Sequence, residues 1–204
     1  MDTSPSDPHN VVDLSAFRNR GEPERPARRP LKLRPPRAEP TRYRLRVELV
    51  DAEVPLWRLI STPSDIALDR LHEAIQATFG WTNSHLHRFT LTDDRYGDET
   101  DGILTRFDVE EGEPGILESE IRLDQVLDEP GATLNYTYDF GDDWHHRVTL
   151  EKLSPLDDTD ATIRCLDGRR AAPPEDVGGI HWYEHLREVA AEPRHPEYAE
   201  LREQ

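Results

Sequence analysis

The sequence YTYDFGDDWHH at residues 136–146 is the stretch that decides the fold most clearly. On either side of its Gly-Asp-Asp segment, aromatic or apolar residues alternate with polar ones. This period of two is typical of β-strands joined by a tight turn. Four aromatic residues, three carboxylates and two imidazoles occupy these eleven positions. A β-hairpin alone does not require such density, so the stretch also predicts a recognition surface.

The strand register of this hairpin follows from the alternation of its side chains. The aromatic faces of the two strands coincide when residues pair symmetrically about the middle of the Gly-Asp-Asp segment. This places Phe140 opposite Trp144. It also places Tyr138 opposite His146 and leaves a three-residue loop, in which Asp143 takes the left-handed conformation that Asp tolerates. Because a Gly at the first loop position fits this scheme less well, a loop of more than three residues is an alternative.

Two interpretations of His146 also stay open. It faces the aromatic side of the predicted hairpin, whereas Asp139 and His145 face the other side. Either His146 and a loop carboxylate bind a ligand or metal, or act as acid and base. Or His146 is hydrogen-bonded inside an aromatic core and the loop carboxylates cap their own turn, which is the more common place for a histidine among aromatic residues.

Patterns elsewhere in the chain predict an α+β fold. Alternation that begins near Tyr43 indicates a strand, and residues 54–60 are its expected partner. Apolar residues at three- and four-residue steps predict a helix over 68–79, capped by Ser64 and ended by Gly80. The other expected elements are a strand at 85–91, an acidic loop at 93–118 with a short strand at 103–106, helical turns at 121–127, and helices at 180–191 and from 196. Because strands and helices do not alternate strictly, we predict a single compact domain with a mainly antiparallel sheet and packed helices.

Charge and proline content separate an N-terminal tail from this domain. Residues 1–42 hold nine Lys/Arg and six Asp/Glu, a balance of +3, so the net charge of −17 leaves −20 on residues 43–204. Closely spaced prolines between 18 and 37 oppose both helix and sheet. Residues 1–40 are therefore predicted to be a disordered, basic, proline-rich tail before a domain at 41–204. The tail is either an electrostatic arm for nucleic acid or an acidic partner, or a solvated linker, which is favoured.

Composition also limits the partners and the compartment. An acidic domain repels phosphate backbones, so nucleic-acid binding is expected only through the basic tail. Cys165 is the single cysteine, which fits a reducing compartment. The sequence lacks a secretory apolar segment and any run of about 18 apolar residues. We expect a cytoplasmic protein that does not enter a membrane and whose partner is a protein or a small molecule.

Two motifs near the C-terminus suggest chemistry. Residues 181–185 spell H-x-x-E-H, a zinc-protease motif, but only nineteen residues follow it, too few for a distant third ligand, so we expect a coincidental match. Residues 173–179, PPEDVGG, place Glu175 and Asp176 just before a helix. Either these carboxylates cap that helix, or its free amides form an anion site; both interpretations stay open.

The sequence YDFGDDW with a following His resembles the signature of the family named after the third open reading frame of a Ri plasmid, also known as an insertion-element passenger protein. Further similar stretches are PLWRLI at 55–60, LHEAIQATFGW at 71–81, HLHRFTL at 85–91 and CLDGRRAAPPEDVGG at 165–179. The resemblance spans about Tyr43 to Tyr198. It implies a compact α+β domain, often associated with plasmids or transposons, whose biochemical role is not established. Some members carry a resolvase-like label, but this domain lacks the serine amid arginines that a serine recombinase needs.

We therefore expect a non-catalytic binding or adaptor domain, which the resemblance associates with plasmids or mobile elements. One alternative is a metal-dependent hydrolase, in which His87, His146 and nearby carboxylates hold a divalent ion that activates water. A second alternative is an accessory protein of DNA recombination. No cofactor is predicted beyond a candidate divalent metal, for which mixed N/O ligands favour Zn, Mn or Fe. The candidate ligand-binding residues are His87, Tyr138, Asp139, Asp142, Trp144, His146, Glu175 and Asp176.

Overall fold

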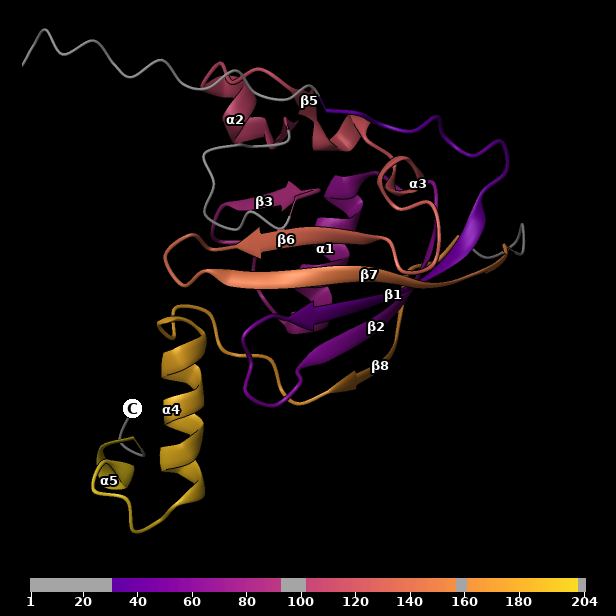
Figure 1. The fold of residues 1–204 in the computed structure, drawn as a ribbon. Coiled ribbons are helices and arrows are strands. Elements are labelled where there is room, and N and C mark those ends of the chain that lie inside the picture. The colour runs from indigo at the N-terminus through magenta and orange to yellow at the C-terminus, as the bar shows by residue number, and fades with distance from the viewer. Residues whose placement is uncertain (1–30, 93–101, 157–160, 202–204) are drawn as a thin grey trace, which may run out of the picture.

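Six strands form one antiparallel sheet in the computed structural model, which describes residues 31–92, 102–156 and 161–201. The order of the strands across the sheet is β3-β6-β7-β1-β2-β8 (Figure 1). Their bounds are β1 (Thr41–Leu49), β2 (Trp57–Pro63), β3 (His87–Thr90), β6 (Thr133–Tyr138), β7 (Trp144–Pro155) and β8 (Arg164–Arg169). Each neighbouring pair is antiparallel.

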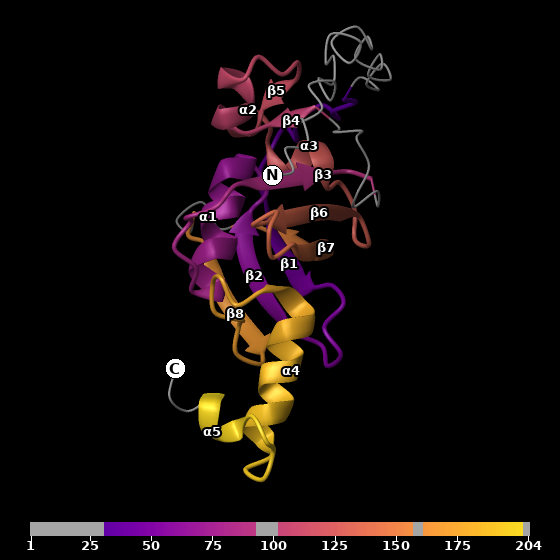
Figure 2. The same ribbon diagram turned by 90° about the vertical axis from the view of Figure 1, so that its left-hand side faces the viewer.

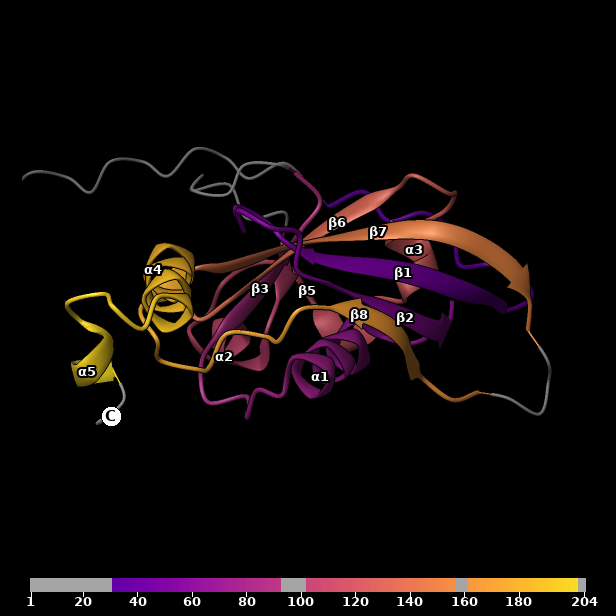
Figure 3. The ribbon, with the colours of Figure 1, turned by 90° about the horizontal axis from the view of Figure 1, so that it is seen from below.

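Helix α1 (Leu68–Phe79) packs across one face of the sheet (Figure 3). Smaller elements lie towards one end of the molecule, where β4 and β5 form a parallel pair near α2 (Figure 2). Their bounds are β4 (Ile103–Leu104), α2 (Arg106–Glu110), β5 (Ile116–Leu117), the 3-10 helix η2 (Glu118–Glu120) and α3 (Leu123–Val126). Helices α4 (Gly179–Ala191) and α5 (Tyr198–Leu201) protrude at the opposite end. The prediction of a single α+β domain with a mainly antiparallel sheet is confirmed.

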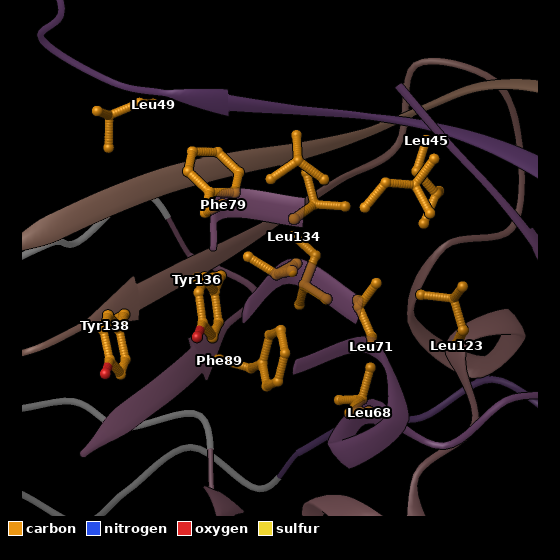
Figure 4. Packing of buried hydrophobic residues seen from close by; sticks show 14 of the residues in the cluster. Leu45, Leu49, Leu68, Leu71, Phe79, Phe89, Leu123, Leu134, Tyr136 and Tyr138 are labelled. Carbon is orange, nitrogen blue, oxygen red and sulfur yellow. The ribbon is translucent and has the colours of Figure 1, made fainter. Parts of the chain in front are cut away.

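Burial follows the two periodicities read from the sequence. Tyr43, Leu45 and Val47 of β1 are fully buried on one face of their strand. They belong to the same core as Leu71 and Ile75 of α1, which are also fully buried (Figure 4). Removing a side chain of this size from water contributes about 1.5–3 kcal/mol, so the packing of α1 on the sheet stabilises the fold.

The two ends of α1 show where local signals succeed and fail. Gly80 ends the helix in the left-handed conformation (φ 77°), as predicted, and its N–H donates to the Gln76 carbonyl at 2.9 Å. Ser64, the predicted N-cap, does not cap the helix. The N-cap is Ala67, whose side chain cannot accept a hydrogen bond. The Ser64 hydroxyl instead accepts the N–H of Thr41 at 3.0 Å, at the start of β1.

Strands β6 and β7 form the predicted hairpin, but their register differs from the expected one by two residues. Tyr138 pairs with Trp144, and Tyr136 pairs with His146. The loop therefore spans residues 139–143 rather than three residues. Because the shift is even, every side chain that remains in β6 or β7 keeps its predicted face.

The hairpin loop is longer because Asp139 forms a turn with its own side chain. Its Oδ1 accepts the N–H groups of Gly141 and Asp142 at 2.9 and 3.3 Å. Asp139 takes the left-handed conformation (φ 55°), and so does Asp143 (φ 52°), the latter as predicted. Phe140, predicted to face Trp144 across the strands, is instead part of the loop with 52% of its surface exposed.

Three other boundaries differ from prediction. β2 begins at Trp57 rather than at 54, after Pro55, which could not have donated to the ladder. Only two residues of the strand expected at 103–106 form β4. Thr105 then starts α2 through a capping box with Asp108, a signal that the acidic composition obscured. Residues 93–101 of the predicted acidic loop lie outside the described residues.

The N-terminal boundary also differs, because residues 31–40 lie on the domain. Leu31 and Leu33 pack against the core. The Arg34 N–H donates to the Gln125 carbonyl at 3.1 Å, and further along the Arg37 guanidinium donates to the Tyr43 hydroxyl at 3.1 Å. The disorder predicted for residues 1–30 concerns residues outside the described ranges. Within those ranges, every helix is too short or too polar to cross a bilayer.

Candidate functional site

Trp144 and His146, two of the predicted site residues, lie inside the core. Both are fully buried, and the His146 ring meets Phe79 and Trp81 edge-on, with centroid separations of 4.8 and 5.4 Å. Neither ring nitrogen of His146 makes a hydrogen bond, and neither does Nε1 of Trp144. Burial lowers the pKa of His146 to about 3, although backbone groups of Trp144 and Tyr136 favour the charged form. His146 is thus a neutral core residue, without the hydrogen bonds that the core interpretation assumed.

His87 belongs to a second buried cluster, between α1 and the sheet. Its Nε2 lies 2.9 Å from the Glu118 carboxylate, and its ring stacks on that of His72 at a centroid separation of 3.6 Å. His72 is bonded through Nδ1 to the Tyr136 hydroxyl and through Nε2 to Asn83 Oδ1, both at 2.8 Å. Burial, and then the neighbouring His87, lowers the pKa of His72 to about 4. His87 is therefore part of a network of hydrogen bonds and stacked rings inside the domain.

The other predicted residues meet at one end of the sheet, where three loops converge. We call this region the three-loop site and define it as residues 81–85, 139–143 and 173–179. The last of these segments, which leads into α4, is called the joint; Figure 1 shows the loop between β6 and β7 directly beside the start of α4. The predicted residues in or next to the site are Tyr138, Asp139, Asp142, Glu175 and Asp176.

Glu175 fastens the joint to the loop after α1. Its Oε2 accepts the N–H and the hydroxyl of Thr82 at 3.0 and 2.6 Å, and its Oε1 accepts the hydroxyls of Ser84 and Tyr138 at 3.2 and 2.5 Å. Burial alone would raise the pKa of Glu175, but the hydrogen bonds from Thr82 and Tyr138 outweigh it and lower the pKa. Burial and the bond to Glu175 raise the pKa of Tyr138. Glu175 is therefore a fixed anion with a structural role.

Asp142 fastens the other end of the joint to the hairpin loop. Its Oδ2 accepts the N–H of Gly178 at 3.0 Å. Gly179 is left-handed (φ 82°) and packs so closely that a Cβ there would lie 2.8 Å from the Asp142 carbonyl oxygen. Only glycine satisfies both conditions. The start of α4 is thus bonded by the hairpin loop and not by Glu175 or Asp176, and the Gly178 amide is not free for an anion.

His85 stands between Asp139 and Asp176. Its Nε2 lies 2.9 Å from Asp176 Oδ1 and 3.7 Å from Asp139 Oδ2. This nitrogen is buried, and neither approach has the geometry of a hydrogen bond. The other oxygen of Asp139, Oδ1, is held by loop amides, so Oδ2 is the one that faces the histidine. One ligand atom from each of the three residues lies within 4.8 Å of the other two.

This cluster has the chemistry of a divalent-cation site. Bonds of about 2.0–2.2 Å in a tetrahedral site place the ligand atoms about 3.3–3.6 Å apart, so the most distant pair needs to close by up to about 1.5 Å. One imidazole nitrogen and two carboxylate oxygens suit Zn, Mn or Fe better than Ca. The Asp176 side chain is 73% exposed, so an ion here would face solvent with coordination positions left for a partner.

The H-x-x-E-H motif forms ion pairs instead of a metal site. Glu184 lies 3.1 Å from the Arg170 guanidinium and 2.6 Å from that of Arg187. His185 is paired with Glu197 at 2.9 Å. The carboxylate that a protease would use as its base is therefore neutralised by two arginines.

Sequence reasoning missed His85, although the residue lies within the HLHRFTL stretch. The period of two assigned it to a strand face together with His87, but β3 begins only at His87. His85 lies before the strand, so its side chain does not have to share a face with that of His87. The Asp139 N–H donates to the Leu86 carbonyl at 2.9 Å. This contact brings His85 to the hairpin loop. The one sequence signal that could have indicated His85 is its pairing with His87 in the HLHRFTL stretch.

Comparison with known proteins places the chain in a family. Residues 41–204 match the family described as "Plasmid pRiA4b ORF-3-like protein". The chain is 37% identical over 161 residues to the uncharacterized protein y4hQ of Sinorhizobium fredii (strain NBRC 101917 / NGR234), a match that covers 78% of each chain. It is also similar to the crystal structure of MM3350, a protein of unknown function from Methanosarcina mazei Go1. That match has a TM-score of 0.68 and 33% identity, and covers 79% of this chain and 88% of the other.

Proposed function

Because this chain belongs to the plasmid pRiA4b ORF-3-like family, and its two relatives above have no assigned activity, we propose a function from the site itself. The domain is a binding module that holds one divalent cation at the three-loop site and presents it to a partner. The observation that carries this proposal is the convergence of His85, Asp139 and Asp176 within 4.8 Å. These residues come from three separate loops, so the cation would also join the loops.

Binding is favoured over hydrolysis because the histidines required by the hydrolase hypothesis are used elsewhere. His146 is sealed among aromatic rings, and His87 is bonded to Glu118. Of the candidate ligand-binding residues, only the carboxylates Asp139 and Asp176 reach the cluster. Roles in recombination or on mobile elements stay predictions that follow from the family.

The surroundings of the cluster support a partner that combines an anionic oxygen with apolar groups. Leu86 and Phe140 flank Asp139 and are 44% and 52% exposed. The Arg88 guanidinium lies 5.4 Å from the centroid of the Phe140 ring. An open metal position beside two apolar side chains and a cation matches a carboxylate or phosphate carried next to an apolar group.

The test is calorimetric titration of the chelator-treated full chain with Mn²⁺ and with Zn²⁺. We expect about one ion per chain. Asp176→Asn should weaken binding by at least about tenfold, about 1.4 kcal/mol, since it replaces a charged ligand at an exposed position where Asn also tolerates the left-handed backbone. His85→Ala should weaken it at least as much.

The matched control is His185→Ala, which removes another partly exposed histidine that pairs with a carboxylate, Glu197. It should bind both ions as the wild type does. The proposal fails if the wild type takes up neither ion at millimolar concentration, or if His85→Ala binds like His185→Ala.

A further inference from the structure

We propose that a cation at this cluster controls the local stability of the joint, and through it how firmly α4 and α5 are held at the end of the sheet. We call these two helices the C-terminal arm. The inference rests on the proposed function, because it needs an ion bound by His85, Asp139 and Asp176. It adds that the ion regulates how firmly the arm is held.

The first turns of the arm pack on the core through Ile180 and Tyr183, and its polar contacts with the rest of the domain run through the joint and the residues just before it. Both views of the ribbon show α4 and α5 extending away from the sheet (Figures 1 and 2). Arg170 pairs with Glu184 at 3.1 Å and donates to the Val54 carbonyl at 2.6 Å. The Tyr183 hydroxyl donates to the Ala171 carbonyl at 3.0 Å. The position of the arm therefore depends on the packing of Ile180 and Tyr183 and on the conformation of a short connecting segment.

Asp176 lies between the two points at which the joint is fastened. Glu175 holds one point through Thr82, Ser84 and Tyr138, and Gly178 holds the other through Asp142. Asp176 itself faces the hairpin loop only by way of His85, 2.9 Å away. An ion bound to all three cluster residues would tie the middle of the joint to the other two loops.

The backbone of the joint needs such contacts to keep its shape. Asp176, Gly178 and Gly179 have φ of 58°, 94° and 82°. The left-handed conformation is unfavourable for a residue with a Cβ, such as Asp176. The carboxylates of Asp139 and Asp176 also approach each other on either side of His85. A divalent cation offsets this repulsion only when the joint is closed.

Linkage gives the size of the effect. We call the joint closed when it lies against the other two loops and open when it is detached from them. If the ion binds only the closed joint, it lowers the population of the open joint by a factor of one plus the ratio of the free-ion concentration to Kd. This factor is about 100 when the ion is at 100 times Kd. The coupling is reciprocal, so a partner that pulls the arm away from the sheet would weaken ion binding by the same factor.

Hydrogen exchange followed by mass spectrometry on the full chain tests the inference, with Mn²⁺ at about 100 times the Kd from calorimetry. Amides in residues 173–182, including the Gly178 N–H, should exchange up to about 100-fold more slowly with the ion. Amides in α1 should not change relative to the ion-free protein. Asp176→Asn at the same Mn²⁺ concentration should show at least about tenfold less slowing in residues 173–182, because its Kd is raised by that factor.

The outcomes separate this inference from the proposed function. If Mn²⁺ binds but exchange in 173–182 changes less than twofold, the ion site stands and the control of the arm is wrong. Equal slowing in α1, or slowing in Asp176→Asn that is as large as in the wild type, also overturns the inference, because the effect would not arise at the joint. If Mn²⁺ does not bind, both proposals fail.

Discussion

Replacing His146 by Leu tests whether the neutral histidine in the aromatic core makes the fold sensitive to acid. The folded pKa of His146 is about 3, below the ordinary value of 6.5. A depressed histidine pKa means that the unfolded chain binds the proton more tightly. Its contribution to stability is therefore complete above about pH 6.5 and is lost as the pH falls towards 3.

The magnitude follows from these two pKa values. Their separation corresponds to about 5 kcal/mol over the whole range, since one pKa unit is about 1.4 kcal/mol. Between pH 7 and pH 5 the loss attributable to His146 is about 2 kcal/mol. His72, whose pKa is also lowered, contributes to the pH dependence of both proteins, so its effect cancels in the comparison. We expect His146→Leu to lose about 2 kcal/mol less than the wild type over this interval.

Urea unfolding followed by tryptophan fluorescence at pH 7 and pH 5 measures this difference. At pH 7 the variant should be at least as stable as the wild type. Leucine removes two buried nitrogens that have no hydrogen-bond partner, each costing about 1–3 kcal/mol, and gives up edge-on ring contacts of about 0.5–1.5 kcal/mol. His181→Leu, at an exposed position of α4, is the control and should keep the wild-type pH dependence. A His146→Leu variant with unchanged pH dependence would refute the assignment of a neutral, unbonded core histidine.

Two further variants test the network and the joint. Gly179→Ala should lower the unfolding temperature and detach the arm more than Gly80→Ala does. Both glycines are left-handed, but only at 179 would the Cβ meet Asp142, at 2.8 Å, whereas nothing lies within 4 Å at 80; equal effects would show that the contact is unimportant. Tyr136→Phe should cost about 1–3 kcal/mol in urea unfolding, because the Tyr136 hydroxyl bonds His72 at 2.8 Å; a change below about 0.5 kcal/mol would contradict the network.

Side-chain periodicity predicted the elements that are held by burial. The alternation around Tyr43 and the three- and four-residue steps of α1 appear in the structure as expected, because water exclusion acts on every residue of those patterns. The faces of the hairpin were also correct. Its loop length was not, since the turn is closed by the Asp139 carboxylate, and one aspartate in an acidic run looks like any other in sequence.

The candidate site was predictable as a set of motifs but not as a geometry. The acidic turn and the PPEDVGG segment both stand out in the sequence, yet the bond from Gly178 to Asp142 joins residues 36 positions apart. Nothing in a single sequence specifies such a long-range pair. Trp144 and His146 were included because recognition surfaces and aromatic cores share the same residue types, and only burial distinguishes the two. His85 was excluded because a strand was extended two residues too far.

The approach of Gly179 to Asp142 matters to anyone who builds hybrids between this domain and its relatives. A methyl group on Gly179 would lie only 2.8 Å from the Asp142 carbonyl oxygen, which leaves no slack for an inserted or deleted residue in the turn at 139–143. The turn and the PPEDVGG segment therefore form a matched pair that must be transplanted together. A hybrid that takes one from each parent would misdirect the helix that follows, even if every buried side chain were retained.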